Sequence, residues 1–287
     1  MVTKIERLGV VGGGQMGGGI AEVGARAGLD VVVCEVNEDA ATAGRARLSK
    51  SLDRAVQNGK LTEADRDAAL ERLRFTTSLS DLADRSMVIE AIAEDEQLKT
   101  KLFADLDEVV SDPDAILASN TSSIPIAKLA GATGRPQQVL GVHFFNPVPV
   151  LKLVELVPSL LTSEETVERA AAFATEQLGK ETIRAKDRSG FVVNALLVPY
   201  LLSAIRMVEG GFASAEDVDK GMVLGCAHPM GPLRLSDLVG LDTLKAIADS
   251  MFEEYGDPNY AAPPLLRRMV DAGLKGKKSG KGFYDYN

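Results

Sequence analysis

The sequence is poor in several residue types: its 287 residues include no tryptophan, two cysteines and two histidines. Two thiols cannot build a disulfide framework or a multi-thiolate metal site, so both of those protein classes are excluded. Cationic residues are also in deficit, since 32 Lys and Arg stand against 41 Asp and Glu and give a formal net charge of −9. A chain with this balance is a poor candidate for binding nucleic acid through its phosphates, and we expect no such partner.

Long apolar runs are missing as well. The longest, residues 191–205, is interrupted by Asn194 and Pro199 and is too short to span a membrane. The first residues run from Lys4 and Arg7 directly into an apolar pattern, without the apolar segment of a secretory signal or an Arg- and Ser-rich transit peptide. We therefore expect a cytoplasmic protein with no membrane partner, and its 45% hydrophobic and 25% charged residues are typical of globular proteins.

A glycine-rich loop near the N-terminus predicts a dinucleotide site. Apolar residues 8–11 lead into Gly12-Gly13-Gly14-Gln15-Met16-Gly17, followed by a helical pattern and a second apolar strand that ends at Glu35. In this context the first glycine permits a tight turn, the second lets a pyrophosphate approach the backbone, and the third lets the helix pack on the strand. A carboxylate at Glu35 would bind the adenosine ribose hydroxyls and repel a 2′-phosphate, which favours NAD over NADP. A glycine-rich turn without a ligand is the alternative.

Further apolar runs predict a mostly parallel sheet covered by helices. Strand-like runs occur at residues 87–90, 115–118, 139–142 and 152–157. Residues 38–78 contain two helical patterns, in which Leu70 and Leu73 belong to the second, and an amphipathic helix is expected at residues 164–179. Thr62 with Asp65 is a candidate cap for the second helix of the pair. This pair is longer than a crossover needs, so we expect it to project from the domain.

The chain changes character at about residue 187. Beyond this point it is mainly helical, with helices expected at residues 191–208, 214–224, 233–253 and 264–273. The expected fold is an α/β domain at residues 1–187, a Rossmann-like doubly wound sheet that carries the projecting helical pair. An all-α domain at residues 188–287 follows it.

Two ionisable residues near one sheet edge are candidates for acid–base chemistry. His143 ends a strand at the edge where ligands of open α/β sheets bind, and Glu155 interrupts the apolar run 153–157. Both are equidistant from Pro149, so an antiparallel return would place them opposite each other. A carboxylate hydrogen-bonded to one imidazole nitrogen leaves the other nitrogen free to take the proton of a substrate hydroxyl, while hydride leaves the carbon that carries this hydroxyl. A core histidine and an edge-strand glutamate are the alternative interpretation.

Other polar residues have both a structural and a functional interpretation. Residues 119–123 supply hydroxyls near the same sheet edge or cap the helix that follows. Asn194 on an apolar helix face fits a satisfied core amide, and His228 lies in a proline-rich turn and is expected to be structural. Residues 275–281 hold the densest positive cluster, which forms a solvated loop or meets phosphates. No metal-ligand pattern is evident.

Seven short blocks, spread over nearly the whole chain, form a recognisable pattern. Besides the glycine loop they are VIEA at 88–91, ASNTSS at 118–123, HFFNP at 143–147, RSGFVVN at 188–194, PMGP at 229–232 and GKKSGKGFY at 276–284. Together they resemble the 3-hydroxyacyl-CoA dehydrogenase family, most closely its short, monofunctional members that act on 3-hydroxybutyryl-CoA. The resemblance implies an oxidoreductase of fatty-acid (lipid) metabolism. It also implies a homodimer, in which the C-terminal domain serves substrate binding and dimerisation.

The resemblance also implies roles for single residues. His143 would be the acid/base, Glu155 would orient it, and Ser122 and Asn194 would bind the reacting end of the substrate. Besides the glycine loop with Gln15 and Met16, the implied cofactor contacts come from Glu94, Lys99, Ser122, Asn146 and Lys278. Ser51 in the helical pair would contact coenzyme A.

Two positions depart from the family pattern. Asn58 stands where the family has a lysine in the helical pair, with Arg54 and Lys60 nearby, and Asp95 stands where many relatives carry Asn. The coenzyme A contacts are therefore less defined by the resemblance than the catalytic ones.

The expected reaction is reversible NAD-dependent oxidation of an (S)-3-hydroxyacyl-CoA, with 3-hydroxybutyryl-CoA and acetoacetyl-CoA as the substrate pair. A dehydrogenase of a free hydroxy acid or sugar acid is one alternative, against which the projecting helical pair and the whole-chain resemblance argue. A nucleotide-binding protein without catalysis is another, but such a protein has no need of both His143 and Glu155.

Overall fold

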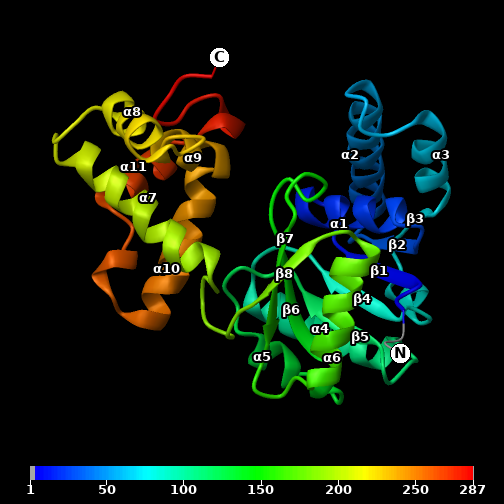
Figure 1. The fold of residues 1–287 in the computed structure, drawn as a ribbon. Helices are drawn as coiled ribbons and strands as arrows, with labels where there is room; N and C mark the ends of the chain where they lie inside the picture. Colours follow the sequence, from blue (N-terminus) through cyan, green and yellow to red (C-terminus); the bar gives the residue numbers. More distant parts are fainter. Residues whose placement is uncertain (1–3, 287) are drawn as a thin grey trace. The chain divides into compact units, whose positions relative to one another are not determined.

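The computed structural model describes residues 4–286, and the chain divides into two compact units, Met1–Asp187 and Arg188–Asn287 (Figure 1). Each unit has a hydrophobic core of its own. Within the described residues, no helix has both the length and the apolar character that a membrane crossing requires.

The first unit is built on one eight-stranded sheet, whose order is β3-β2-β1-β4-β5-β6-β7-β8. The strands are β1 (Arg7–Val11), β2 (Asp30–Cys34), β3 (Leu73–Thr76), β4 (Met87–Glu90), β5 (Ile116–Ser119), β6 (Val139–Phe144), β7 (Leu153–Pro158) and β8 (Glu181–Arg184). The first six strands are parallel, β7 is antiparallel to β6, and β8 runs parallel to β7. This order confirms the doubly wound, mostly parallel sheet that the sequence predicts.

Among the described residues, the first unit has six α-helices: α1 (Gln15–Arg26), α2 (Glu38–Gln57), α3 (Glu63–Glu71), α4 (Glu96–Val109), α5 (Ile126–Ala130) and α6 (Glu164–Ala172). Helices α2 and α3 lie side by side and extend from α1 away from the sheet, as Figure 1 shows. Thr62 caps α3 by accepting the N–H of Asp65 at 3.1 Å, as predicted. The projecting helical pair is thereby confirmed.

The second unit is helical and contains α7 (Val193–Glu209), α8 (Ala215–Cys226), α9 (Pro232–Val239), α10 (Leu241–Tyr255) and α11 (Pro264–Asp271). The fully buried carboxylate of Asp237 accepts the N–H groups of Phe283 and Tyr284, both at 3.0 Å. This contact fixes the C-terminal segment, which carries Lys278, to α9.

Several predicted element bounds are wrong. Leu73 begins strand β3 rather than extending a helix, and neither β3 nor β8 is predicted, because both are four-residue strands with half-exposed side chains and no apolar run. The helix expected at 233–253 is two helices, since Gly240 has a φ of 99° and breaks the chain between α9 and α10. The helical region expected at 164–179 is confirmed as far as Gln177, but only Glu164–Ala172 (α6) is α-helical and Phe173–Gln177 is π-helical.

We expect Gly17→Ala to destabilise the first unit, because a Cβ at this position would lie 1.8 Å from the carbonyl oxygen of Gly12. Replacing glycine by alanine within a helix ordinarily stabilises the protein, so a loss of stability here would show that the clash outweighs the helix preference. The expected loss is about 1–3 kcal/mol, or a fall in Tm of roughly 3–10 °C by thermal unfolding. Gly14→Ala is the control: its Cβ would clash with no other part of the chain, so Tm should fall much less than in Gly17→Ala. Equal Tm values for both variants would contradict this packing argument.

Candidate active site

The glycine loop turns from β1 into α1 and leaves an open space beside the helix N-terminus. Gly12 has a φ of 92° and donates its N–H to the carbonyl of Cys34 at 2.9 Å. The N-cap of α1 is Gly14, which gives the helix no side-chain cap, and no atom from elsewhere in the described chain lies within 4 Å of where its Cβ would be. A phosphate can therefore approach the first N–H groups of α1.

Glu35 follows β2 and lies beside this loop. Its Oε1 accepts the N–H of Gly13 at 2.6 Å. A cavity of about 650 Å³ is lined by the glycine loop and Glu35 together with apolar side chains, among them Val36, Leu79, Ile92 and Leu98. Cys34 also lines it, and burial, with a smaller effect of Glu35, raises the pKa of its thiol to about 11, so the thiol is neutral. An apolar cavity with one carboxylate suits an adenosine group.

Arg47 on α2 holds the loop from its other side. Its Nη1 donates to the carbonyl oxygen of Gly13 at 2.7 Å. Gln15, at the start of α1, donates from Nε2 to Oδ1 of Asn146 at 3.0 Å and so links the loop to the segment after β6. Gln15 and Asn146 were both expected at the site, whereas Arg47 was not, because in the sequence it is one of several cations on a polar helix.

His143 and Glu155 are directly opposed in the antiparallel pairing of β6 with β7. Nδ1 of His143 lies 2.7 Å from Oε2 of Glu155, and the two residues are 5% and 0% exposed. The carboxylate can only accept, so Nδ1 carries the hydrogen and Nε2 of a neutral imidazole is the acceptor. The symmetric spacing about Pro149 thus predicts the pairing correctly.

Ser122 lies on the other side of the imidazole. Its Oγ is 3.0 Å from Nε2 of His143, and since this nitrogen is the acceptor, the hydroxyl donates. Ser122 belongs to the loop after β5, and Asn120 of the same loop accepts the N–H of Phe144 at 2.8 Å. The structure therefore brings together three of the residues expected at the reacting centre: Ser122, His143 and Glu155.

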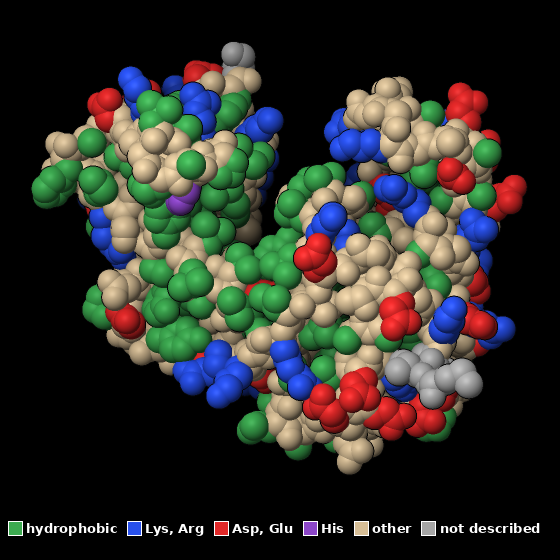
Figure 2. Space-filling view, in the orientation of Figure 1, with side chains coloured by type: hydrophobic (Ala, Val, Ile, Leu, Met, Phe, Trp, Pro, Cys, Tyr) green, Lys and Arg blue, Asp and Glu red, His purple; other side chains and the backbone are tan. Residues whose placement is uncertain are grey.

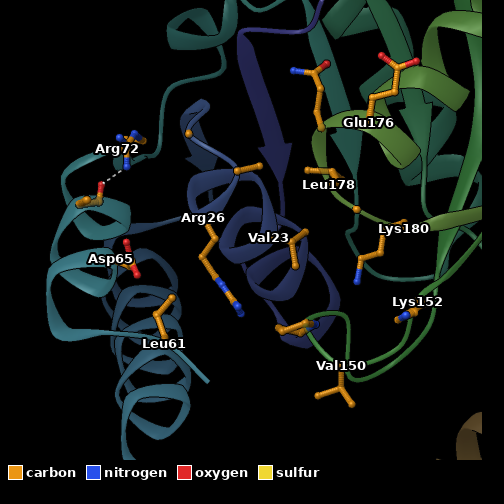
Figure 3. Close-up of a pocket in the computed structure, with 16 residues that line it drawn as sticks. Val23, Arg26, Leu61, Asp65, Arg72, Val150, Lys152, Glu176, Leu178 and Lys180 are labelled. Atoms are coloured by element: carbon orange, nitrogen blue, oxygen red, sulfur yellow. Dashed lines mark hydrogen bonds between the residues drawn. The ribbon is translucent and has the colours of Figure 1, made fainter. Parts of the chain in front are cut away.

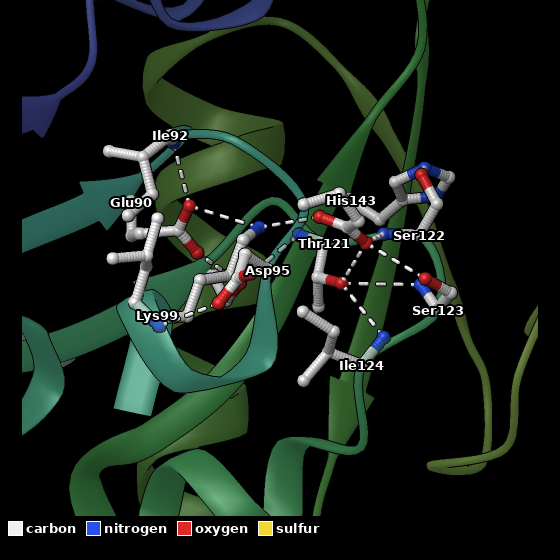
Figure 4. A network of polar contacts seen from close by, with 12 residues as sticks. Glu90, Ile92, Asp95, Lys99, Thr121, Ser122, Ser123, Ile124 and His143 are labelled. Carbon is white, nitrogen blue, oxygen red and sulfur yellow. Dashed lines mark hydrogen bonds and ion pairs between the residues drawn. The ribbon is translucent and has the colours of Figure 1, made fainter. Parts of the chain in front are cut away.

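A network of ion pairs and hydrogen bonds supports the Ser122 loop (Figure 4). The ammonium of Lys99 lies 2.6 Å from Oε2 of Glu94. Oε1 of Glu94 accepts from the N–H of Ser122 and from the hydroxyls of Thr121 and Ser123. Burial alone would raise the pKa of Glu94, but Lys99, the Thr121 hydroxyl and the Ser122 N–H hold it below its ordinary value. Glu94 thus binds both Lys99 and the Ser122 loop, and the expected contacts of Glu94 and Lys99 to the nicotinamide stay predictions.

Glu90, the last residue of β4, completes the network and is not assigned a role by the sequence. Its Oε1 lies 3.0 Å from the ammonium of Lys99 and accepts the N–H of Ile92 at 2.7 Å. Its Oε2 accepts the hydroxyl of Ser119 at 2.6 Å. Burial raises the pKa of the Glu90 carboxyl, and Lys99 acts against this rise.

A second cavity, of about 440 Å³, lies between α1, α2 and the segment after β6. Gln15 and Asn146 line it, and so do Ser51 and three cations of α2: Arg47, Lys50 and Arg54. Asn58, where the family has a lysine, is the C-cap of α2 and does not line this cavity. Arg54 stands one helical turn before Asn58 and supplies a positive charge instead.

A third cavity lies at the far end of α1 from the glycine loop (Figure 3). The cations Arg26 and Lys180 line it, yet both have partners within the chain. Arg26 pairs with Glu22 at 3.3 Å, and the ammonium of Lys180 donates to the carbonyls of Val148 and Leu151 at 2.6 and 2.8 Å. These contacts stabilise the fold, and we assign the cavity no part in the chemistry.

Asn194 and Lys278 belong to the helical unit. Asn194 is half-buried in the first turn of α7. The ammonium of Lys278 lies 2.5 Å from Oδ1 of Asp242; burial acts to raise the pKa of that carboxyl, and the Lys278 contact keeps it below its ordinary value. Their expected contacts to substrate and cofactor stay predictions. Within residues 4–286, no group of three or more His, Cys, Asp or Glu could hold a metal ion.

Two family models match the chain. The NAD-binding domain of 3-hydroxyacyl-CoA dehydrogenase matches residues 7–188, and the C-terminal domain of 3-hydroxyacyl-CoA dehydrogenase matches residues 190–286. A protein of Mycobacterium tuberculosis named 3-hydroxybutyryl-CoA dehydrogenase is 67% identical over 286 residues, which cover 100% of both chains. A probable 3-hydroxybutyryl-CoA dehydrogenase of Bacillus subtilis is 47% identical, over 99% of this chain and 98% of that one.

Solved structures agree with this similarity. The crystal structure of M. tuberculosis FadB2 superposes with a TM-score of 0.98 at 67% identity, covering 99% of this chain and 100% of that one. The (S)-3-hydroxybutyryl-CoA dehydrogenase PaaH1 of Ralstonia eutropha gives a TM-score of 0.93 at 45% identity, again over 99% and 100% of the two chains. This chain belongs to the 3-hydroxyacyl-CoA dehydrogenase family.

Proposed function

We propose that the chain catalyses the reversible, NAD-dependent oxidation of (S)-3-hydroxyacyl-CoA to 3-oxoacyl-CoA in fatty-acid metabolism. The observation that carries the proposal is the hydrogen-bonded row Glu155, His143 and Ser122 at the sheet edge that also holds the glycine loop. Relatives at 67% and 49% identity are named for 3-hydroxybutyryl-CoA, so a four-carbon acyl group is the proposed substrate.

The proton path runs through the imidazole. Nε2 of His143 takes the proton of the C3 hydroxyl, while the C3–H bond breaks and its electron pair leaves with the hydrogen as hydride, so that a C3=O double bond forms. Glu155 stabilises the resulting imidazolium, and Ser122 donates a hydrogen bond to the C3 oxygen. In the reduction the imidazolium returns the proton to that oxygen. NAD, when bound, supplies the hydride acceptor.

The glycine loop fits NAD. The space at Gly14 leaves room for the pyrophosphate, and Arg47 fixes the loop through the Gly13 carbonyl. The carboxylate of Glu35 would accept hydrogen bonds from the adenosine ribose and would repel the 2′-phosphate of NADP. Glu94, Lys99 and Asn146 would hold the nicotinamide side.

Coenzyme A would bind in the cavity between α1 and α2. Its phosphates need cations, and Lys50 and Arg54 line this cavity together with Ser51. Arg54 would take the place of the family lysine that Asn58 replaces.

The helical unit would contribute Asn194 to the substrate thioester, Lys278 to the cofactor, and the surface of a homodimer. Large hydrophobic side chains are exposed on it, including Leu196 at 74%, Phe212 at 81% and Leu224 at 73%. Figure 2 shows hydrophobic side chains gathered on the visible face of this unit. Burying such a surface against a second copy would be favourable. With two free thiols, Cys34 and Cys226, the chain suits the reducing cytoplasm, where we place it.

The reaction is tested by following NADH absorbance with acetoacetyl-CoA. We expect rapid oxidation of NADH with acetoacetyl-CoA, at least a hundredfold less with free acetoacetate, and a similar loss when NADPH replaces NADH. Turnover of free acetoacetate at a comparable kcat/KM would overturn the thioester assignment. Equal use of NADPH would overturn the role of Glu35.

His143→Gln should lower kcat by about 10²–10⁴, because glutamine preserves polarity but cannot take the hydroxyl proton. NADH affinity, measured by fluorescence titration, should stay within about twofold of the wild type, since the glycine loop is unaltered. His228→Gln changes the other histidine of the chain and serves as the control with normal turnover. A His143→Gln enzyme with near-normal kcat would remove His143 from the mechanism.

Arg54→Ala should raise KM for acetoacetyl-CoA by about tenfold with kcat nearly unchanged, because the lost contact is to a phosphate remote from the reacting carbon. Acetoacetyl-pantetheine lacks the nucleotide phosphates, so its KM should be the same in the variant and the wild type. Lys60→Ala removes an exposed cation that does not line the cavity and should leave both KM values unchanged. Equal increases in KM for the two substrates would argue against a phosphate contact.

A further inference from the structure

Glu90, Lys99 and Glu94 form a charged group whose charges do not cancel. Every polar contact of the Glu90 carboxyl comes from a donor: the Lys99 ammonium, the Ile92 N–H and the Ser119 hydroxyl. Its Oε1 already accepts two of these donors, one of them an ammonium at 3.0 Å, and this ion pair makes Glu90 a carboxylate. The carboxyl of Glu94 likewise accepts from all of its partners. Two carboxylates and one ammonium leave a net charge of −1.

This charge lies where water screens it poorly. Glu90 is 0% exposed and the side chain of Lys99 is 1% exposed, while that of Glu94 is 41% exposed. The neighbouring carboxylates differ from this group: Asp95 is exposed and caps α4, and Glu96 is paired with Lys128 at the surface. Glu90 is therefore a local source of poorly screened negative potential, in addition to the buried carboxylate of Glu155 that pairs with His143.

The position of the group relative to the cofactor follows from the sheet. The inference rests on the proposed function, in which the adenosine lies at Glu35 beyond the end of β2. A dinucleotide that crosses the β1–β4 switch point then carries its nicotinamide toward the ends of β4 and β5. Glu90 is the last residue of β4, and its partner Ser119 is the last residue of β5. The nicotinamide ring is a cation in NAD⁺ and neutral in NADH.

We propose that Glu90 sets the preference of this site between the two redox forms of the cofactor. Its carboxylate makes the Glu90–Lys99–Glu94 group net negative, which stabilises the cationic ring of NAD⁺ and leaves the neutral ring of NADH unaffected. Glu90 is thus a specificity residue that acts through charge, without touching the substrate.

Glu90→Gln tests the charge, because glutamine can still accept from Ile92 or Ser119 but makes the group neutral. NADH is titrated by its fluorescence and NAD⁺ by displacement of NADH, both without substrate. We expect the ratio Kd(NAD⁺)/Kd(NADH) to rise about tenfold relative to the wild type. An unchanged ratio in the folded variant would overturn the proposal.

Two further variants separate charge from packing. Glu90→Gln combined with Lys99→Met neutralises both buried partners and leaves the charge of −1 on Glu94, so the ratio should return toward the wild-type value. Ser119→Ala removes a contact of Glu90 but no charge, and its ratio should equal that of the wild type. A ratio that shifts further in the double variant, or shifts equally in Ser119→Ala, would assign Glu90 a purely structural role and contradict the proposal.

Three further outcomes are also decisive. If Glu90→Gln does not fold, Glu94→Gln removes the same charge from the more exposed end of the group, and it must raise the ratio for the proposal to stand. If the wild type binds neither NADH nor NAD⁺, the proposed function itself fails. If it binds both and the ratios do not move, only the role of Glu90 fails.

Discussion

The site depends on the reversal of chain direction between β6 and β7. In the parallel part of the sheet, polar residues meet only where strands end, whereas the antiparallel return sets a residue within β7 directly opposite the end of β6. His143 and Glu155 share one face for this reason, and a register shift of one residue would turn Glu155 to the other face. The imidazole stabilises the buried carboxylate, and the same hydrogen bond fixes the orientation of the imidazole ring.

The sequence predicted those parts of the fold that have a strong local signal. Continuous apolar runs predicted the central strands, and helical spacing with a cap at Thr62 predicted the α2–α3 pair. The equal spacing of His143 and Glu155 about Pro149 predicted their pairing. The edge strands β3 and β8 lack an apolar run because one side of each meets no other strand, and the break at Gly240 depends on one backbone angle that spacing does not reveal.

The parts of the site that could not be predicted arise from tertiary packing. Glu90 ends a strand, and Lys99 lies on a helix nine positions further along the chain. No sequence pattern predicts their ion pair, because it forms only when α4 packs against the sheet. Arg54 could be named as a nearby cation, but only the cavity distinguishes it from Lys60. The proposed roles of Asn194 and Lys278 rest on family resemblance alone.

The two cysteines differ in a way that is useful for spectroscopy. Cys34 is buried and its thiol, with a pKa of about 11, is almost entirely protonated at neutral pH, whereas Cys226 is exposed at the end of α8. A maleimide dye therefore attaches to the helical unit at one chemically defined point in the unmutated chain. Paired with the intrinsic fluorescence of NADH, such a label allows the distance between the labelled helix and the bound cofactor to be measured by resonance energy transfer.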